Sequence, residues 1–304
     1  MESPLVISDE VRQATADGRG VVALESTIFS NLGLPSPANQ EALIRCIGAI
    51  EDAGAVPALT AVLDGVPRVG LAPAEHERIL GPATKLAERD LGVAMAQGWA
   101  VGATTVSASA ALAAGAGVAV FATGGIGGVH RGNAVSGDVS ADLGAIARHP
   151  VTTVCAGAKS FLDLGKTVEQ LETLGVPVLG YGTDTFPAFY GRSSGIPVPH
   201  RVDGPEEVAA IVAARRSVQP SAGGVLVAVP IPEADALPQV ELDEALDAAL
   251  AAAARDGLTG AAITPFVLAH MAQVTEGRSV PANLALAENN ASVAAQIATE
   301  LAGR

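Results

Sequence analysis

The sequence predicts an α/β protein built as one domain, and three observations lead to this prediction. Short apolar runs of strand length alternate with amphipathic helical segments along the chain. Glycine-rich turns follow several of the predicted strands. No linker, internal repeat or block of like charge divides residues 1–304 into two units, and a chain of this length can bury one large core.

Composition and charge exclude several classes of protein. Although 49% of the residues are hydrophobic, the excess is largely alanine and valine, and no run reaches the ~18 apolar residues that a membrane-spanning helix needs. The N-terminus, MESPLVISDE, has neither the basic start nor the apolar core of a signal peptide, so we expect a cytoplasmic protein. A net charge of −14 argues against nucleic acid as a partner. Cys46 and Cys155 both lie in apolar contexts and are predicted to be buried thiols.

The N-terminal part of the chain is predicted to alternate helix and strand. Residues 5–18 are expected to form a helix, and GVVALES a buried strand ending on Glu25. After a turn-rich loop, Asn39 is expected to cap a helix over residues 40–52. The run AVPALTAVLDGVPRVGL predicts two strands joined by an Asp-Gly hairpin turn, which makes one pair of strands antiparallel.

The next segments introduce two candidate features. PAEHERIL is expected to be helical, and Lys85 follows a brief strand-like piece just before another helix, where a lysine can reach the mouth of the sheet and pair with an anion. VGATTVSASAALAAGAG is rich in small residues and predicts a helix packed closely on the sheet, capped by Thr104 and Thr105.

The stretch from Val118 to Ser160 has the strongest functional pattern. An apolar strand-like run passes into TGGIGGVHRG, and glycines of this kind bring backbone N–H groups close to an anionic ligand. No G-x-G-x-x-G can be placed on it, so a dinucleotide site is not indicated. Ser140 is expected to cap the helix that follows. Asp138 and Asp142, if helical, share one face and could hold a hard cation. VTTVCAGAK predicts a second strand, ending on Lys159.

The remainder predicts further α/β units. An amphipathic helix carries Lys166 on its polar side, the strand VPVLGYGTD follows, and TFPAFYGRSSGIPVPHRVD is expected to be a long binding loop. A helix over 204–217, the strand GGVLVAVPIP and an alanine-rich helix near 238–256 come next. TPFVLAHMAQVTEG and PANLALAENNASVAAQIATEL are expected to be two terminal helices.

The choice of basic residues singles out the lysines. Of 18 basic residues only three are lysines, namely Lys85, Lys159 and Lys166, and arginine cannot replace lysine as an amine nucleophile. Each lysine is therefore either a chance survivor of coding bias or a functional amine. The role of Glu25 is similarly open, because a carboxylate at the end of a strand could be catalytic or part of a surface ion pair. A lone histidine such as His130 is more often structural than a ligand or base.

Many segments together resemble one known family. They include VALESTIFS, TKLAERD, GATTV, FATGGIGGVHRG, the D-x-S-x-D loop, VCAGAKSFLDLG, ETLGVPVLGY, PIPE, TPF and the N-x6-NN helix. In order, from about residue 5 to the C-terminus, they are similar to the pseudouridine-5'-phosphate glycosidases, also called indigoidine synthase A-like proteins. The resemblance implies a three-layer α/β/α core. Because the predicted hairpin makes one pair of strands antiparallel, we expect the central sheet to be mixed.

The resemblance also implies a reaction and a set of site residues. The reaction is the reversible cleavage of pseudouridine 5'-phosphate to uracil and ribose 5-phosphate, by a homotrimer that holds one Mn²⁺ ion per subunit. Lys159 would be the nucleophile that forms a Schiff base with the opened sugar, Glu25 the acid, and Asp138 the manganese ligand. Substrate-binding positions would be Lys85, Val106, Thr123, His130, Ser140, Ala141, Asp142 and Asn283.

The chemistry agrees with these residue types. Ordinary glycosidases use two carboxylates to expel an oxygen leaving group. Pseudouridine joins ribose to a carbon of uracil, so no heteroatom can be protonated at the break, and an iminium on C1' supplies the electron sink that a second carboxylate cannot. The cation and Lys85 would offset the phosphate charge in an acidic protein.

Two departures and two alternatives accompany this reading. The family usually has a His-Gly pair where this chain has Asn31, Leu32 and Gly33, and an asparagine where it has Val229. A sugar kinase-like transferase would need a G-x-G-D type motif near the C-terminus, which is absent. A non-catalytic sugar-phosphate-binding protein would keep its function without Lys159.

Overall fold

The computed structural model describes residues 4–219, 221–258 and 263–304. In this part of the chain, strands join into one sheet with β1, β4, β3, β2, β7, β8, β11, β9 and β10 in order, while β6 pairs with β3 and β5 with β6. The sheet is mixed as expected, because β3 runs antiparallel to β4 and β6 and the other pairs are parallel. The strands are Val6–Ile7, Val21–Leu24, Val56–Leu63, Val66–Val69, Thr84–Leu86, Val101–Thr104, Val120–Ala122, Thr152–Cys155, Val178–Tyr181, His200–Val202 and Val225–Ala228 for β1 to β11.

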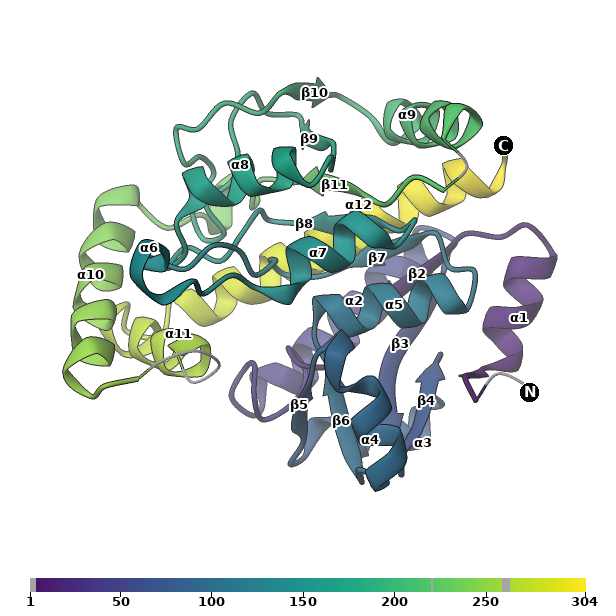
Figure 1. Ribbon diagram of the computed structural model, residues 1–304, viewed down its shortest axis with the longest axis horizontal. Helices are drawn as coiled ribbons and strands as arrows, with labels where there is room; N and C mark the ends of the chain where they lie inside the picture. The colour runs from purple at the N-terminus through teal and green to yellow at the C-terminus, as the bar shows by residue number, and fades with distance from the viewer. Residues whose placement is uncertain (1–3, 220, 259–262) are drawn as a thin grey trace.

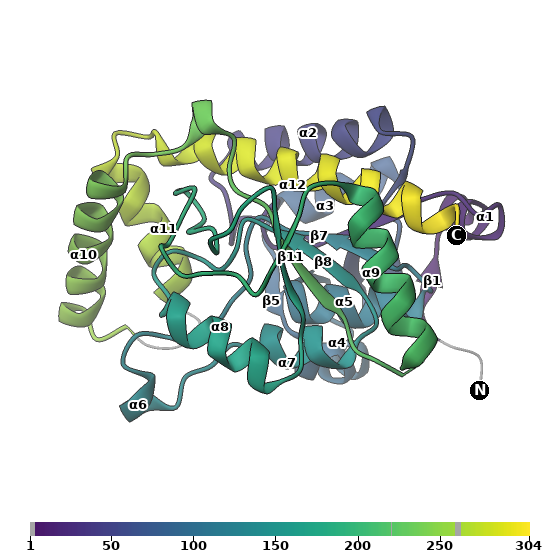
Figure 2. The same cartoon turned by 90° about the horizontal axis from the view of Figure 1, so that it is seen from above.

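Helices cover both faces of the sheet, which confirms the three-layer prediction (Figure 2). On one face lie α2 (Ala38–Asp52) and the long C-terminal α12 (Ser279–Ala302), with α9 (Pro205–Val218) packed on α12. On the other lie α5 (Val106–Gly115), α7 (Ala141–Arg148) and α8 (Leu164–Thr173). The other helices are α1 (Asp9–Ala16), α3 (Pro73–Leu80), α4 (Leu91–Gln97), α6 (Asn133–Ser136), α10 (Gln239–Arg255) and α11 (Ile263–Val274), the last two lying together at one end of the molecule (Figure 1).

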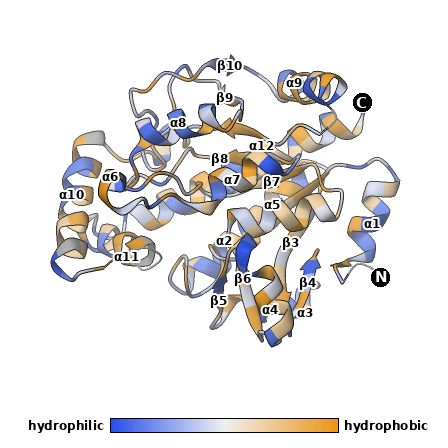
Figure 3. Cartoon of the chain, in the orientation of Figure 1, coloured by the Kyte–Doolittle hydropathy of each residue, from blue (hydrophilic) through white to orange (hydrophobic). Residues whose placement is uncertain are grey.

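The central strands are hydrophobic on both sides because helices cover both of their faces (Figure 3). All residues of β2, β7, β8 and β11 are buried, and these strands run parallel to their neighbours along the middle of the sheet. Their carboxyl ends therefore meet at one edge, where Glu25 and the glycine-rich stretch leave the sheet. Cys46 and Cys155 are buried free thiols as predicted, and burial raises the pKa of each to about 12.

Most of the predicted elements are present, including the hairpin, whose turn residues Asp64 and Gly65 have φ of 52° and 75°. Three predictions at element ends were wrong. Residues 5–18 are not all helical, because Val6–Ile7 pairs with β4 and Ser8 then caps α1. Asn39 does not cap α2 but lies inside it, where its amide donates to the carbonyl oxygens of Phe29 and Leu80. Thr104 ends strand β6 and does not cap a helix, whereas Thr105 is the N-cap residue of α5, as predicted, without a capping hydrogen bond from its side chain.

The central stretch also differs in detail from the prediction. Strand β8 ends at Cys155 rather than at Lys159, because Ala156 to Lys159 bend away through Gly157, whose φ is 78°. Asp138 lies before α7 and not on it, so it does not share a helix face with Asp142. The long loop after β9 contains strand β10 near its end. No helix among the described residues is long and apolar enough to span a membrane.

Candidate active site

A cavity of about 550 Å³ opens at the edge where the parallel strands end. Nine of the eleven predicted site residues line it, although they come from six separate parts of the chain. They are Glu25, Lys85, Val106, His130, Asp138, Ser140, Ala141, Asp142 and Lys159. The fold therefore gathers the residues that the sequence singled out for chemistry into one place.

Glu25 follows β2 directly and is 7% exposed. Burial raises the pKa of its carboxyl group, while the positive charge of Lys159 and a hydrogen bond donated by the Thr123 hydroxyl act in the opposite direction. A carboxyl group with a raised pKa holds its proton closer to neutral pH and can serve as a general acid. Its position at a strand end left Glu25 open between a catalytic acid and a surface ion pair, and the acid role was what the family resemblance implied.

Lys159 is held at the cavity by the turn that follows β8. Its N–H donates to the carbonyl oxygen of Ile126 at 3.1 Å, and its own carbonyl accepts from the N–H of Leu162 at 3.0 Å. Gly157 permits this turn, since a Cβ there would lie 2.2 Å from the carbonyl oxygen of Pro187. The turn therefore places the amine of Lys159 in the same cavity as the carboxyl group of Glu25.

Lys85 lies at the cavity from strand β5. Partial desolvation in the cavity lowers its pKa, and the positive charge of Lys159 lowers it further. The two lysines therefore act on each other through their charges, and a bound anion would relieve the repulsion between them. Lys166, in contrast, is 54% exposed and pairs with Asp163 at 3.1 Å, which confirms that it lies on the polar side of its helix.

Asp142 is 6% exposed, and both of its carboxylate oxygens are bonded to the backbone. One oxygen accepts from the N–H of Ser107 at 3.1 Å and the other from the N–H of Gly127 at 2.8 Å. Ser140 caps α7 as predicted, accepting from the N–H of Asp142 at 3.2 Å. The N–H of Gly127 is therefore engaged by a carboxylate of the protein itself, and Asp142 holds the glycine loop against the start of α5.

Asp138 and His130 both line the cavity, and a carboxylate oxygen of Asp138 lies 3.8 Å from Nδ1 of His130. Burial lowers the pKa of His130, and the charge of Asp138 opposes this effect. Within the described ranges no three His, Cys, Asp or Glu side chains converge as a closed metal site. Manganese or magnesium held by one or two protein oxygens, with water and substrate completing the shell, is still compatible with this donor set.

Two predicted pocket residues do not line the cavity. Thr123 lies behind Glu25, to which its hydroxyl donates. Asn283 is 4% exposed on α12, and its amide donates to the Tyr190 hydroxyl at 3.3 Å. Of the two departures from the family pattern, Leu32 lines the cavity, whereas Val229 is buried and its N–H donates to the carbonyl oxygen of Cys155.

Several cavity residues were not predicted from the sequence. Thr27, Arg89, Asp90, Thr105, Ser107 and Phe161 all line it. Phe161 and Arg89 lie within the segments VCAGAKSFLDLG and TKLAERD, so proximity to Lys159 and Lys85 was the available signal. The aromatic ring of Phe161 lies 6.1 Å from that of His130, centroid to centroid, and gives the cavity one apolar wall.

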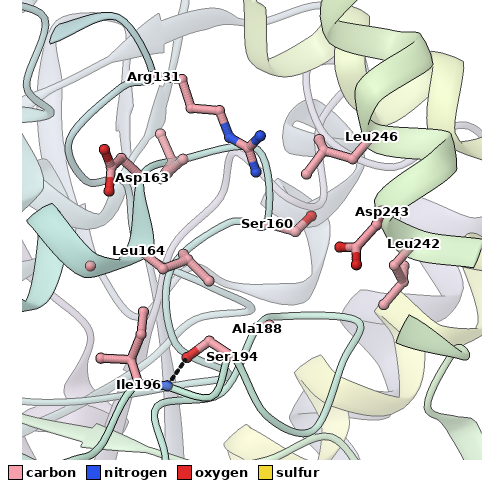
Figure 4. Close-up of a pocket in the computed structure, with 12 residues that line it drawn as sticks. Arg131, Ser160, Asp163, Leu164, Ala188, Ser194, Ile196, Leu242, Asp243 and Leu246 are labelled. Atoms are coloured by element: carbon pink, nitrogen blue, oxygen red, sulfur yellow. Dashed lines mark hydrogen bonds between the residues drawn. The ribbon is translucent and has the colours of Figure 1, made fainter. Parts of the chain in front are cut away.

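A second cavity, of about 440 Å³, is lined by Ser160 and Asp163, which follow Lys159 in the chain, and by residues of α10 (Figure 4). Leu162 lines both cavities, but none of the predicted site residues lines the second one. Polar groups there already bond within the protein, since the Ser194 hydroxyl accepts from the N–H of Ile196 and Asp163 caps α8. We therefore place the candidate site in the first cavity.

The chain is similar in sequence to a described protein family and to named relatives. The family model described as indigoidine synthase A like protein matches residues 10–300. The chain is 50% identical over 301 residues to a protein of Myxococcus xanthus named pseudouridine-5'-phosphate glycosidase, covering 98% of both chains. It is 51% identical over 299 residues to a protein of that name from Streptomyces griseus, covering 98% of this chain and 92% of the relative.

Solved structures show the same fold. A crystal structure of the prealnumycin C-glycosynthase AlnA in complex with ribulose 5-phosphate aligns with a TM-score of 0.89 at 38% identity, covering 98% of this chain and 97% of that one. An indigoidine synthase A-like protein from Thermotoga maritima aligns with a TM-score of 0.88 at 32% identity, covering 99% and 98%. The similarity in both sequence and structure extends over nearly the whole chain.

Proposed function

Because the chain belongs to the indigoidine synthase A-like family, we propose that it is an enzyme that reversibly cleaves the carbon–carbon glycosidic bond of pseudouridine 5'-phosphate, giving uracil and ribose 5-phosphate. Relatives with about half of their residues identical are named for this activity. The observation that carries the proposal is the pairing, in one cavity, of the amine of Lys159 with a buried carboxyl group of raised pKa, Glu25.

The two residues divide the reaction between them. Glu25 gives its proton to the ring oxygen as the Nζ of Lys159 bonds to C1', which opens the sugar. The bond from C1' to uracil then breaks, its electron pair is protonated at the uracil carbon, and C1' becomes an iminium of Lys159. Water hydrolyses this Schiff base, which frees ribose 5-phosphate and the lysine.

The remaining cavity residues suit the phosphate ester. Val106 and Ala141 begin helices α5 and α7, and both line the cavity, so two helix N-termini lie there. The N–H groups of Ser107 and Asp142 at these ends are bonded to side chains of the protein. Lys85 adds a positive charge beside them. Asp138 would hold the divalent cation, which when bound would offset negative charge of the substrate. One Mn²⁺ per subunit, the homotrimer and the cytoplasmic location stay predictions from the sequence.

The proposed activity is tested by incubating the protein with pseudouridine 5'-phosphate and a divalent cation, without ATP. We expect uracil and ribose 5-phosphate in equal amounts by liquid chromatography, and the synthetic reaction when both products are supplied. A requirement for ATP would favour the kinase-like alternative instead. Binding without any turnover would favour a non-catalytic sugar-phosphate-binding protein.

Replacing Lys85 by methionine is expected to raise KM for pseudouridine 5'-phosphate by about 10- to 100-fold, with a smaller effect on kcat. The reason is that the variant keeps the length of the side chain but removes a charged hydrogen bond to the phosphate, worth roughly 1.5–3 kcal/mol. Steady-state kinetics measure this split. An unchanged KM would remove Lys85 from the phosphate site.

Removing the divalent cation with EDTA is expected to lower activity at least about tenfold, and manganese should restore it. Asp138→Asn should raise the manganese concentration needed for half-maximal activity, because the amide is a weaker and uncharged ligand. Isothermal titration of the metal alone provides a readout that does not depend on turnover. Equal manganese affinity in both proteins would contradict the assignment of Asp138.

A further inference from the structure

An asparagine buried in the long C-terminal helix bonds to the backbone directly behind the candidate acid. Asn290, on α12, has no exposed surface. Its amide nitrogen donates to the carbonyl oxygen of Thr123 at 2.9 Å and to that of Gly124 at 3.2 Å. These are the first two residues after strand β7, so α12 fixes the point at which the chain leaves the sheet.

The same residue, Thr123, is bonded on three sides. Its N–H donates to the carbonyl oxygen of Val154 at 3.0 Å, its carbonyl accepts from Asn290, and its hydroxyl donates to the carboxyl group of Glu25. The bonds to both of its backbone groups hold the Cα of Thr123 in place, and the bond to Glu25 sets the direction of the hydroxyl. A continuous path of hydrogen bonds thus leads from the buried face of α12 to Glu25.

We propose that Asn290 is a positioning residue for the proton donor Glu25, acting through the backbone and hydroxyl of Thr123. The inference rests on the proposed function, because it assigns the acid role to Glu25. Asn290 does not line the cavity, so it is not a contact of a substrate bound there.

The free-energy cost of burying the amide of Asn290 argues against a role that is limited to filling space in the core. The Oδ1 atom of Asn290 is buried and has no hydrogen-bond partner in the described part of the chain, which carries a desolvation penalty. Its neighbours on the buried side of α12 include Leu286, Ala287, Val293 and Ala294, which are all apolar. A leucine, which has the same number of side-chain heavy atoms and no polar group, would avoid the penalty, so the two donated bonds are the feature that the asparagine supplies.

The proposal predicts a change in the pH dependence. The charged groups that act on Glu25 are Lys159, Asp142 and Lys85, and substitution at Asn290 leaves all three in place. Donation from Thr123 favours the ionised carboxylate and so lowers the pKa of Glu25. Losing it raises that pKa, and since Glu25 must be protonated to act, the alkaline limb of kcat/KM moves to higher pH.

The test compares pH profiles and turnover of five proteins of full length. They are the unchanged chain, Asn290→Leu, Thr123→Val, the double variant, and Asn289→Leu as a control from the same turn of α12. We expect Asn290→Leu and Thr123→Val to lower kcat several-fold with little change in KM and to move the alkaline limb in the same direction. The double variant should match Thr123→Val, because both changes are expected to disrupt the same interaction, the hydrogen bond from the Thr123 hydroxyl to Glu25. Asn289→Leu should keep the profile.

Three results would overturn the inference. These are an unchanged pH profile in folded Asn290→Leu, a shift equal to that of Asn289→Leu, or effects that add in the double variant. If Asn290→Leu does not fold, Asn290→Ala, which removes the same donors with less bulk, is measured in its place. Failure of the proposed function is distinct, because the unchanged chain would then not cleave pseudouridine 5'-phosphate at all. If only the acid role of Glu25 is wrong, Glu25→Gln keeps full turnover.

Discussion

Replacing Lys159 by alanine is expected to lower kcat on pseudouridine 5'-phosphate by on the order of 10⁴-fold or more. The variant removes the amine whose electron pair forms the iminium at C1' as the bond to uracil breaks. Lys85, the other lysine of the cavity, lies on strand β5 and is expected to bind the phosphate. Binding of the substrate should persist, since the helix N-termini and Lys85 are unchanged. Single-turnover kinetics and isothermal titration separate the two effects.

Two matched variants make this prediction specific. Lys159→Arg keeps the positive charge but cannot form an imine, so it should be as inactive as the alanine variant. Lys166→Ala removes an exposed lysine that pairs with Asp163 and should keep near-normal turnover. Undiminished turnover in Lys159→Ala would rule out the imine route.

Replacing Glu25 by glutamine is expected to lower kcat by about 10²- to 10⁴-fold, because the amide cannot give a proton to the ring oxygen. The same change is expected to stabilise the fold at alkaline pH. The pKa of Glu25 is raised in the folded protein, so the stability that the protonated group contributes is present below its unfolded pKa and is lost as pH rises through the folded pKa. Glutamine stays neutral and does not lose it.

Thermal melts of both proteins across pH test the second half of this prediction. The melting temperature of Glu25→Gln relative to that of the unchanged chain should rise as the pH is increased above the ordinary pKa of a glutamate, about 4.3. Glu169→Gln, on the exposed side of α8, should show no such trend. A variant that keeps turnover, or that loses stability at alkaline pH, would contradict the role of Glu25 as a buried acid.

Periodicity and turn chemistry predicted most of the fold. The Asp64-Gly65 turn, the buried strand before Glu25 and the helix capped by Ser140 depend on local preferences, and each is present. The elements that could not be predicted depend on distant partners. Val6–Ile7 is a strand because β4 lies beside it, and Asn39 lies within α2 because its amide finds carbonyls at Phe29 and Leu80.

The site was predictable where residue type carried the signal. Rarity made Lys85, Lys159 and Lys166 candidates, a strand-end position did the same for Glu25, and the family resemblance selected the three of them that line one cavity. Nothing in the local sequence showed that both carboxylate oxygens of Asp142 accept hydrogen bonds from backbone N–H groups. Nor did it show that Thr123 lies behind Glu25 rather than in the cavity. Such relations depend on how distant segments meet, which no spacing rule contains.

Trapping the covalent intermediate tests the central claim most directly. The protein is mixed with ribose 5-phosphate, reduced with borohydride, digested, and the modified peptide is identified by mass spectrometry. We expect one sugar phosphate per chain, attached to Lys159, and none on Lys85 or Lys166. The absence of an adduct in an active preparation, or an adduct on either other lysine, would contradict the account.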